Sequence, residues 1–310
     1  RPFPSVSIPP IEHHRMSLSS HPFRGPLFML LATGAYVVND TLMKLATESL
    51  PPYEVLMLRG VAGLIWGVPL LLILGYGPKL AQMLNGRVLA RNICETASVL
   101  CYVVALANMP IADVIALVQI TPLLVLLGAS LFFREQISGV TILLIVVGFV
   151  GALLVAQPSG SGISIYTFLA IATAVIGAGR DLLGRRVSHA IPGMIVSIST
   201  ILVVFVGAGV AHLAFEDWTP LTFPAVLLLL GAGLFLIFGH FFLFMAYRIG
   251  PTSADAPFYY AFTVWAVISG LAVFGHLPNG LALCGIVLVI TSGLAIAFLH
   301  ERRKRRLAAA

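Results

Sequence analysis

The sequence predicts an all-α polytopic membrane protein with ten transmembrane helices arranged as two inverted five-helix repeats. Three observations lead to this fold class. Of the 310 residues, 59% are hydrophobic and only 10% are charged, whereas a soluble domain carries about 25% charged residues. Long apolar runs recur along the whole chain. The two halves of the sequence can also be overlaid with a nearly constant shift.

Ten apolar segments have the length of about 20 residues that a helix needs to cross a bilayer. Prolines, glycines and charged clusters separate them. Two connections are very short, "NMP" at 108–110 and "IGP" at 249–251, and they predict antiparallel neighbours. The predicted spans are residues 27–46, 54–75, 88–108, 111–133, 138–157, 163–184, 192–214, 224–247, 252–275 and 279–299.

The distribution of Lys and Arg predicts that both termini are cytoplasmic, because cytoplasmic loops carry an excess of basic residues. Lys44 and Arg59 are exceptions, and both are expected near outer helix ends. The segments predicted to lie inside contain Arg15, Arg24, Lys79, Arg87, Arg91, Arg134, Arg185, Arg186, Arg248 and the cluster at 302–306. The uncharged "QPSGSGIS" and the acidic "FEDW" then fall in outer loops.

The repeat appears when the second half is shifted by 141 or 142 residues. Asp40, Leu42, Lys44 and Pro51 fall on Asp181, Leu183, Arg185 and Pro192. Later, Ala112, Asp113, Thr121, Gly128, Phe132 and Gly151 fall on Ala254, Asp255, Thr263, Gly270, Phe274 and Gly293. An odd number of helices in each half inverts the second half, as in many transporters. The predicted division is 1–26, an N-terminal tail; 27–157 and 158–299, the repeats; and 300–310, a basic tail.

Composition also excludes several classes of protein. The net charge of +6 is concentrated in "ERRKRR" at 301–306 and between apolar segments, which indicates membrane topology rather than nucleic-acid binding. Cys94, Cys101 and Cys284 lie in apolar segments without a CxxC pair, so neither a metal site nor a disulfide framework is expected. No HExxH, GxSxG or paired catalytic Asp pattern occurs within the helices, and we expect neither an enzyme nor a cofactor.

Residues 102–151, "YVVALANMPIADVIALVQITPLLVLLGASLFFREQISGVTILLIVVGFVG", resemble the EamA-type repeat of the drug/metabolite transporter superfamily. Arg59 in the second helix also fits this pattern, whereas Val264 and His276 depart from it in the second half. The motif residues are Tyr102, Ala105, Leu106, Pro110, Pro122, Phe132, Glu135, Gly148 and Gly151. The nearest resemblance is to bacterial inner-membrane exporters of aromatic and other amino acids, the YddG type. It implies a secondary exporter with a central cavity between the repeats.

The third helix has a polar stripe that should face the interior of the bundle. Asn92, Glu95, Ser98 and Tyr102 follow each other at steps of three or four residues, which places them on one helix face. Ionisable groups inside a membrane usually face the bundle interior. Glu95 is a candidate for relaying a proton or holding a substrate ammonium group. A structural pair with Arg91, four residues earlier, is the alternative.

Two further helices provide polar candidates. Tyr36 and Asn39 lie in the first helix, and His240 and Phe244 share a face of the eighth. The repeat maps Ser98 and Tyr102 onto His240 and Phe244. Asp40 with Lys44, and Asp181 with Arg185, are spaced as local ion pairs at helix ends.

The fourth and ninth helices complete the predicted substrate site. Gln119 lies near mid-span, and Pro122 should free a backbone carbonyl one turn earlier and bend the helix. Tyr259 and Trp265 belong to an aromatic cluster that could line the cavity. Asp113, in the first turn of its helix, suits the positive end of the helix dipole and is expected to be structural.

The leading hypothesis is a secondary transporter that exports aromatic and other uncharged amino acids and related small metabolites. Protons are a candidate coupling ion, a facilitator is equally allowed, and a monomer is expected. The alternative is uptake or exchange of another metabolite, such as a nucleotide sugar or sugar phosphate. Anionic phosphates would need several inward-facing Lys or Arg residues, and the sequence places few of these deep in the membrane.

Overall fold

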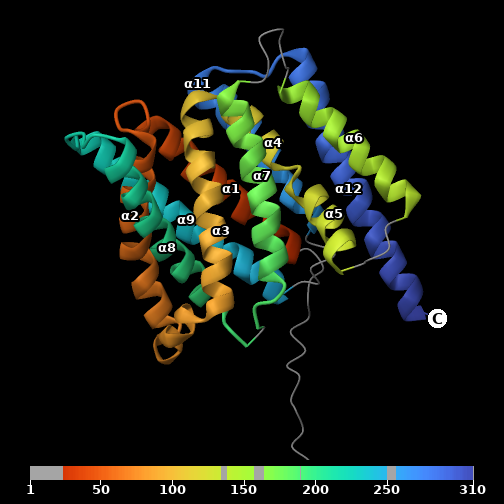
Figure 1. Ribbon diagram of the computed structural model, residues 1–310, viewed down its shortest axis with the longest axis horizontal. Helices are drawn as coiled ribbons and strands as arrows, with labels where there is room; N and C mark the ends of the chain where they lie inside the picture. Colours follow the sequence, from red (N-terminus) through yellow and green to blue (C-terminus); the bar gives the residue numbers. More distant parts are fainter. Residues whose placement is uncertain (1–23, 134–137, 157–163, 189, 250–255, 310) are drawn as a thin grey trace, which may run out of the picture.

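The computed structural model describes residues 24–133, 138–156, 164–188, 190–249 and 256–309. The described residues form α-helices and two 3₁₀ segments, without a strand (Figure 1). The first half contains α1 (Arg24–Ala46), α2 (Pro52–Ile73), η1 (Gly77–Leu84), α3 (Gly86–Asn108), α4 (Ile111–Val118), α5 (Thr121–Phe133) and α6 (Gly139–Ala156). The second half contains α7 (Ile165–Gly184), α8 (Gly193–Phe215), α9 (Phe223–Ile249), η2 (Ala256–Tyr260), α11 (Ala261–Phe274) and α12 (Gly280–Ala309).

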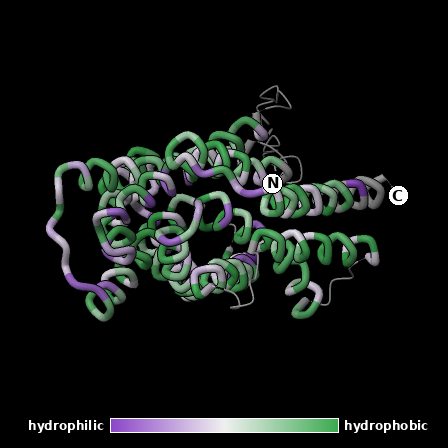
Figure 2. The backbone as a smooth tube through the Cα atoms, turned by 90° about the horizontal axis from the view of Figure 1, so that it is seen from above, coloured by the Kyte–Doolittle hydropathy of each residue, from purple (hydrophilic) through white to green (hydrophobic). Residues whose placement is uncertain are grey.

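Every predicted span corresponds to helix in the described residues, but not every helix is long. Among the residues that the structure describes, eight stretches are long and apolar enough to cross a membrane. Two further apolar helices, Gly139–Val155 and Phe258–Phe274, are shorter. Large apolar side chains such as Ile73, Leu131 and Leu213 are exposed on the outside, and hydrophobic residues dominate the helices in Figure 2. The chain is therefore an all-helical, multi-pass membrane protein, and the number of ten spans stays a prediction.

Contacts between helices relate the two halves to each other. The first helix of one half packs against the third long helix of the other, so α1 contacts α9 and α7 contacts α3. The second helices, α2 and α8, pack together, as do the last helices, α6 and α12. Exchanging the halves leaves this pairing unchanged. A two-fold axis between inverted repeats has this consequence, and the pairing supports the predicted repeat.

The direction of the helices also agrees with alternating crossings. Thr41 of α1 forms a hydrogen bond with Ser269 of α11, with an Oγ1–Oγ distance of 2.5 Å. Seven residues earlier in α1, Gly34 lies beside Trp265 of α11. Residue numbers therefore increase in the same direction along both helices. Helices that begin on the same side of a membrane must be parallel in this way.

The fourth predicted span is interrupted at Gln119 and Ile120, just before Thr121 and Pro122. Proline has no backbone N–H, so the carbonyl of Val118 loses its helical donor. The Thr121 hydroxyl donates to this carbonyl instead, at 2.6 Å. The break between α4 and α5 at Gln119 and Ile120 confirms the effect predicted for Pro122. The ninth predicted span is also divided, into η2 and α11.

The α6–α12 pair extends away from the other helices (Figure 1). Glycines allow its close approach, because a Cβ at Gly151 would lie 2.7 Å from the carbonyl oxygen of Gly285. Small residues have this role in membrane helix packing generally. Helix α12 continues to Ala309, beyond its predicted end at residue 299. The added segment, "ERRKRRLAA", lacks proline and glycine and contains good helix formers.

Candidate substrate site

A cluster of polar and charged side chains lies inside the helix bundle, between the two halves of the chain. Asn39 is 2% exposed, and Arg59 is 9% exposed. Buried ionisable groups are costly inside a membrane and mark functional sites by default. The members are Tyr36, Asn39 and Asp40 of α1, Arg59 of α2, Glu95 and Tyr102 of α3, Arg180 and Asp181 of α7, and His240 of α9.

Asp40 joins α1 to α3 within this cluster. Tyr102 donates its hydroxyl to Asp40 Oδ2 at 2.7 Å, and Asn39 donates Nδ2–H to Asp40 Oδ1 at 2.8 Å. Both carboxylate oxygens therefore have a donor. The local ion pair expected between Asp40 and Lys44 does not form, because Lys44 Nζ donates to the carbonyls of Leu106 and Met109. The four-residue spacing therefore does not predict the partner of Lys44, because this side chain reaches the carbonyls at the end of α3.

Glu95 joins α3 to α7. Its Oε2 pairs with Nη1 of Arg180 at 2.5 Å, and Arg180 Nε pairs with Asp181 Oδ1 at 2.8 Å. The predicted alternative partner, Arg91, donates instead to Asn92 and to Thr200 of α8. The repeat equivalent of Arg180 is Asn39, so the two halves differ at these related positions.

Tyr36 joins α1 to α9. Its hydroxyl lies 2.8 Å from Nδ1 of His240, and the two rings meet edge to face at 5.5 Å. Gly239 permits this approach, because any Cβ there would clash with the tyrosine ring. The predicted candidates Tyr36 and His240 are thus brought together by the fold. Their roles in substrate binding stay predictions.

Arg59 is one of four charged members of the cluster that were not among the predicted site residues; the others are Asp40, Arg180 and Asp181. Arg59 was expected near a helix end, but its side chain is buried in α2. The charges of Asp40 and Glu95, and the phenol of Tyr102, act on its guanidinium group. Its position seven residues into an apolar helix indicated a place in the site, because intramembrane arginines usually face the bundle interior.

The polar stripe of α3 does face inward, but it divides among three partners. Asn92 bonds Ser199 of α8 at 2.9 Å, and Ser98 donates to the Thr173 carbonyl of α7 at 2.9 Å. Glu95 and Tyr102 point to α7 and α1, as described above. The Ser98 hydrogen is therefore used between helices. A substrate role for Ser98 stays a prediction.

The remaining predicted residues surround the cluster at different distances from it. Gln119 is buried and donates to the Tyr259 carbonyl at 3.5 Å, linking α4 to η2. Tyr259 lies next to Phe262, which contacts the Tyr36 ring. Phe244 instead lies against Gly193 at the start of α8. Trp265 lies beside Gly34 and is 38% exposed, so this ring is a less enclosed wall than Tyr259.

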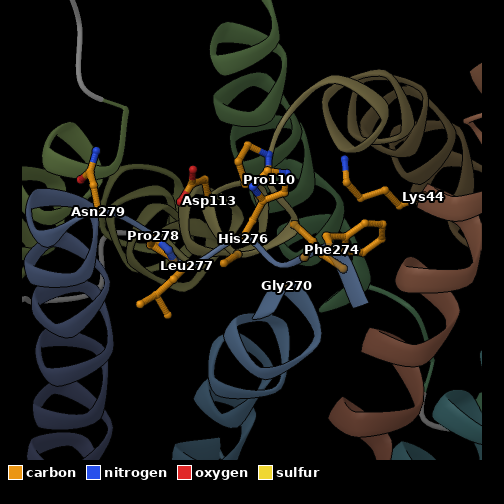
Figure 3. A pocket seen from close by; sticks show the side chains of 11 residues that line it. Lys44, Pro110, Asp113, Gly270, Phe274, His276, Leu277, Pro278 and Asn279 are labelled. Carbon is orange, nitrogen blue, oxygen red and sulfur yellow. The ribbon is translucent and has the colours of Figure 1, made fainter. Parts of the chain in front are cut away.

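A separate pocket of about 240 Å³ lies near the ends of α1, α4 and α11, which are predicted to be outer ends. Figure 3 shows Lys44, Asp113, Phe274 and His276 among its lining residues. Asp113 occupies the first turn of α4, as predicted; its repeat equivalent, Asp255, lies outside the described residues. One carboxylate oxygen of Asp113 is buried without a hydrogen-bond partner in the described structure.

Lys44 holds this outer end together. Its Nζ donates to the carbonyls of Leu106 and Met109, both at 2.7 Å, and lies 5.6 Å from the Phe274 ring centroid. The ammonium group thus satisfies carbonyls at the negative end of α3. It also connects α1 to the end of α11. This side chain therefore links α1 to the ends of α3 and α11.

The described residues contain no group of three or more His, Cys, Asp or Glu side chains arranged to hold a metal ion. The Glu95 carboxylate is paired with Arg180, and the Asp40 carboxylate accepts a hydrogen bond from Tyr102. The arrangement can therefore provide hydrogen bonds, charges of both signs and aromatic surfaces to a small molecule.

Comparisons with known proteins agree with a transport function. The model of the EamA-like transporter family matches residues 23–157. The chain is 27% identical to a riboflavin transporter of Vibrio cholerae over 94% of this chain and 98% of the relative. It is 28% identical to a pseudopaline exporter of Pseudomonas aeruginosa over 88% of this chain and 95% of the relative. These names do not favour the alternative of nucleotide sugars or sugar phosphates.

A solved crystal structure shares the fold. The TM-score is 0.64, with 18% sequence identity over 89% of this chain and 98% of that chain. The YddG-type subgroup stays a prediction, because the relatives described above carry other names. The first half of the chain is thus similar to the EamA-like transporter family, and nearly the whole chain is similar to curated transporters.

Proposed function

We propose that this protein is a secondary transporter that exports amino acids, aromatic and other uncharged ones, and related small metabolites. The observation that carries this proposal is the partly buried cluster containing carboxylates, guanidinium groups and aromatic rings. An amino acid is a zwitterion with a variable side chain. It needs a cationic partner, an anionic or polar partner, and an apolar wall, and the cluster contains all three.

The aromatic wall consists of rings from both halves of the chain. Tyr36 and Phe262 meet edge to face with centroids 6.5 Å apart, and Tyr259 lies 6.2 Å from Phe262. Aromatic rings prefer edge-to-face or offset contacts with further rings. A substrate with an aromatic or apolar side chain suits this surface. Replacing Trp265 with Ala should alter the range of substrates carried, while leaving protein expression unchanged.

Exposure differs between equivalent positions of the two halves, which supports alternating access. Asp40 is buried, whereas the side chain of its repeat equivalent, Asp181, is 43% exposed. Lys44 bonds two backbone carbonyls at the predicted outer end. We infer a state closed at the outer end and more open at the predicted cytoplasmic end. Transport would exchange these two arrangements by rocking between the halves.

Counterflow in proteoliposomes tests the proposed function. Vesicles preloaded with an unlabelled amino acid should accumulate the radiolabelled form, with and without an imposed pH gradient. Glu95→Gln should reduce this uptake, and unchanged activity across pH would assign Glu95 to packing alone. Riboflavin, tested in the same vesicles, compares the substrate named for a relative. Absence of uptake for every amino acid would overturn the proposal.

We further place the protein in the cell inner membrane as a monomer with both termini in the cytoplasm. The clusters of basic residues at segment ends support this orientation. Reporter fusions at each end provide the test. Activity of a periplasm-dependent reporter at either end would contradict the orientation, and so would a cytoplasm-dependent reporter that is inactive there.

A further inference from the structure

We propose that Arg59 binds the carboxylate of the substrate while Asn39 accepts a hydrogen bond from its ammonium group. This inference rests on the proposed transport of amino acids and names the groups that would recognise them. It assigns a substrate contact to Arg59, and it gives Asn39 a defined chemical role. The two residues belong to adjacent helices, α1 and α2.

Arg59 is buried but lacks a hydrogen-bond partner in the described part of the chain. Its Nε is fully enclosed and unpaired, and its side chain is 9% exposed. A buried donor without an acceptor carries a desolvation penalty. The penalty is larger for a charged group. A bound anion would satisfy these N–H groups.

The carboxylates near Arg59 already accept hydrogen bonds from other donors. Asp40 accepts hydrogen bonds from Tyr102 and Asn39, and Glu95 pairs with Arg180. Their negative charges act on Arg59 and stabilise it as a cation, but their oxygens are directed to other partners. The guanidinium group is thus electrostatically supported and still available for hydrogen bonding.

Asn39 has a buried acceptor atom without a donor in the described structure, which complements the unpaired donor of Arg59. Its amide Nδ2 donates to Asp40 at 2.8 Å, so the orientation of the amide is fixed. Its Oδ1 is buried and has no donor among the described residues. An ammonium group offers three N–H donors. The Asp40 carboxylate bonds the Nδ2 side of the same amide, and its negative charge nearby favours a cationic donor over a neutral one.

Together the two vacancies match a zwitterion rather than a simple anion or cation. A guanidinium group can bind a carboxylate through two parallel hydrogen bonds. A doubly charged phosphate suits the position poorly. Asp40 and Glu95 both lie near Arg59, and their negative charges would repel the phosphate. With the polar ends of the substrate held there, its side chain can contact the aromatic wall of Tyr36 and Phe262.

The test compares ligands that differ by one charged group. L-Tyrosine, tyramine, which lacks the carboxylate, and 3-(4-hydroxyphenyl)propionate, which lacks the ammonium group, compete for counterflow in proteoliposomes. In the wild-type protein we expect tyrosine to compete at least about tenfold better than either analogue. In Arg59→Gln the potency of tyrosine should fall about tenfold or more, while that of tyramine changes less than about threefold.

The variants of Asn39 and Arg59 need matched controls. Asn39→Leu should lower the potency of tyrosine more than that of 3-(4-hydroxyphenyl)propionate, because only tyrosine has the ammonium group. Arg87→Gln removes an exposed arginine that bonds the Arg186 carbonyl, and it should leave all three potencies unchanged. If Arg59→Gln fails to fold in a thermal melt, Arg59→Lys decides instead, since it retains the charge without the planar fork. It should selectively weaken tyrosine.

The outcomes separate the two proposals. If wild-type vesicles carry no amino acid, the proposed function fails, and this inference fails with it. If they carry tyrosine, and folded variants of Arg59 lose tyrosine and tyramine equally or retain the wild-type preference, only the assignment of Arg59 is overturned. Equal weakening of tyrosine and the propionate by Asn39→Leu would overturn the assignment of Asn39.

Discussion

The hydroxyl of Tyr102 in α3 donates to Oδ2 of Asp40 in α1 at 2.7 Å. Asp40 is buried and Tyr102 is half-buried, and the two residues are 62 positions apart in the chain. The bond supplies one of the two donors to the Asp40 carboxylate; Asn39 supplies the other. It therefore fixes the carboxylate next to Arg59 and connects the scaffold of the bundle to the candidate site.

Tyr102→Phe should reduce both stability and transport. The substitution retains the ring but removes the donor to a buried carboxylate, and hydrogen bonds to charged groups contribute about 1.5–3 kcal/mol. Thermal unfolding in detergent and counterflow in vesicles measure the two effects. Tyr166→Phe is the control, because Tyr166 is exposed at the start of α7. Equal effects of the two substitutions would contradict a special role for the Tyr102–Asp40 bond.

Glu95 and Arg180 should behave as a coupled pair. We expect Glu95→Gln and Arg180→Gln each to destabilise the protein, since either leaves a charge with fewer partners. The double variant should be less destabilised than the sum of the two, by about 0.5–3 kcal/mol. A double-mutant cycle of chemical or thermal unfolding measures this difference. Asp181→Asn should have a smaller effect, because this side chain is 43% exposed; strict additivity for Glu95 and Arg180 would refute the pair.

Thr121→Val should destabilise the broken fourth span. The substitution removes the hydroxyl that satisfies the Val118 carbonyl, which Pro122 leaves without its backbone donor. An unsatisfied buried carbonyl costs about 1–3 kcal/mol. Thr291→Val is the matched control, because Thr291 makes the same kind of bond to Val287 at an exposed position with an intact helix. Thermal unfolding of both variants should show the larger loss for Thr121.

Lys44→Met should loosen the predicted outer end. It removes the ammonium group that bonds the carbonyls of Leu106 and Met109 while retaining most of the side-chain volume. A single cysteine at Ile111, 1% exposed in this structure, reports opening through its reaction with a membrane-impermeant maleimide. We expect labelling to become faster in Lys44→Met.

That labelling experiment starts from a protein in which Cys94, Cys101 and Cys284 are replaced. A cysteine at His276, which is exposed at the rim of the same pocket, should react equally with and without Lys44. An unchanged labelling rate at position 111 would show that Lys44 does not hold the outer end closed. Faster labelling at both positions would indicate general loosening instead.

The sequence by itself determined the helices, because a helix that faces lipid requires a local run of apolar residues. Pro122 likewise predicted a break through a local cause, the missing N–H. Periodicity correctly directed Glu95 and Tyr102 to the interior of the bundle, since the faces of a helix depend only on its own spacing. The equal pattern of the two halves indicated an inverted repeat, whereas the pairing of α1 with α9 and of α3 with α7 came from the structure.

Only the tertiary structure decided which groups meet. Glu95 pairs with Arg180 across 85 positions rather than with nearby Arg91, and Lys44 bonds carbonyls of α3 rather than Asp40. Arg59 joined the site because α1 and α3 bring Asp40 and Glu95 beside it. The physical reason is that a long polar side chain can reach several partners that are equally suitable by local spacing. The packing between helices decides which of them it contacts. Local spacing specifies the face of a residue, whereas its partner depends on the whole bundle.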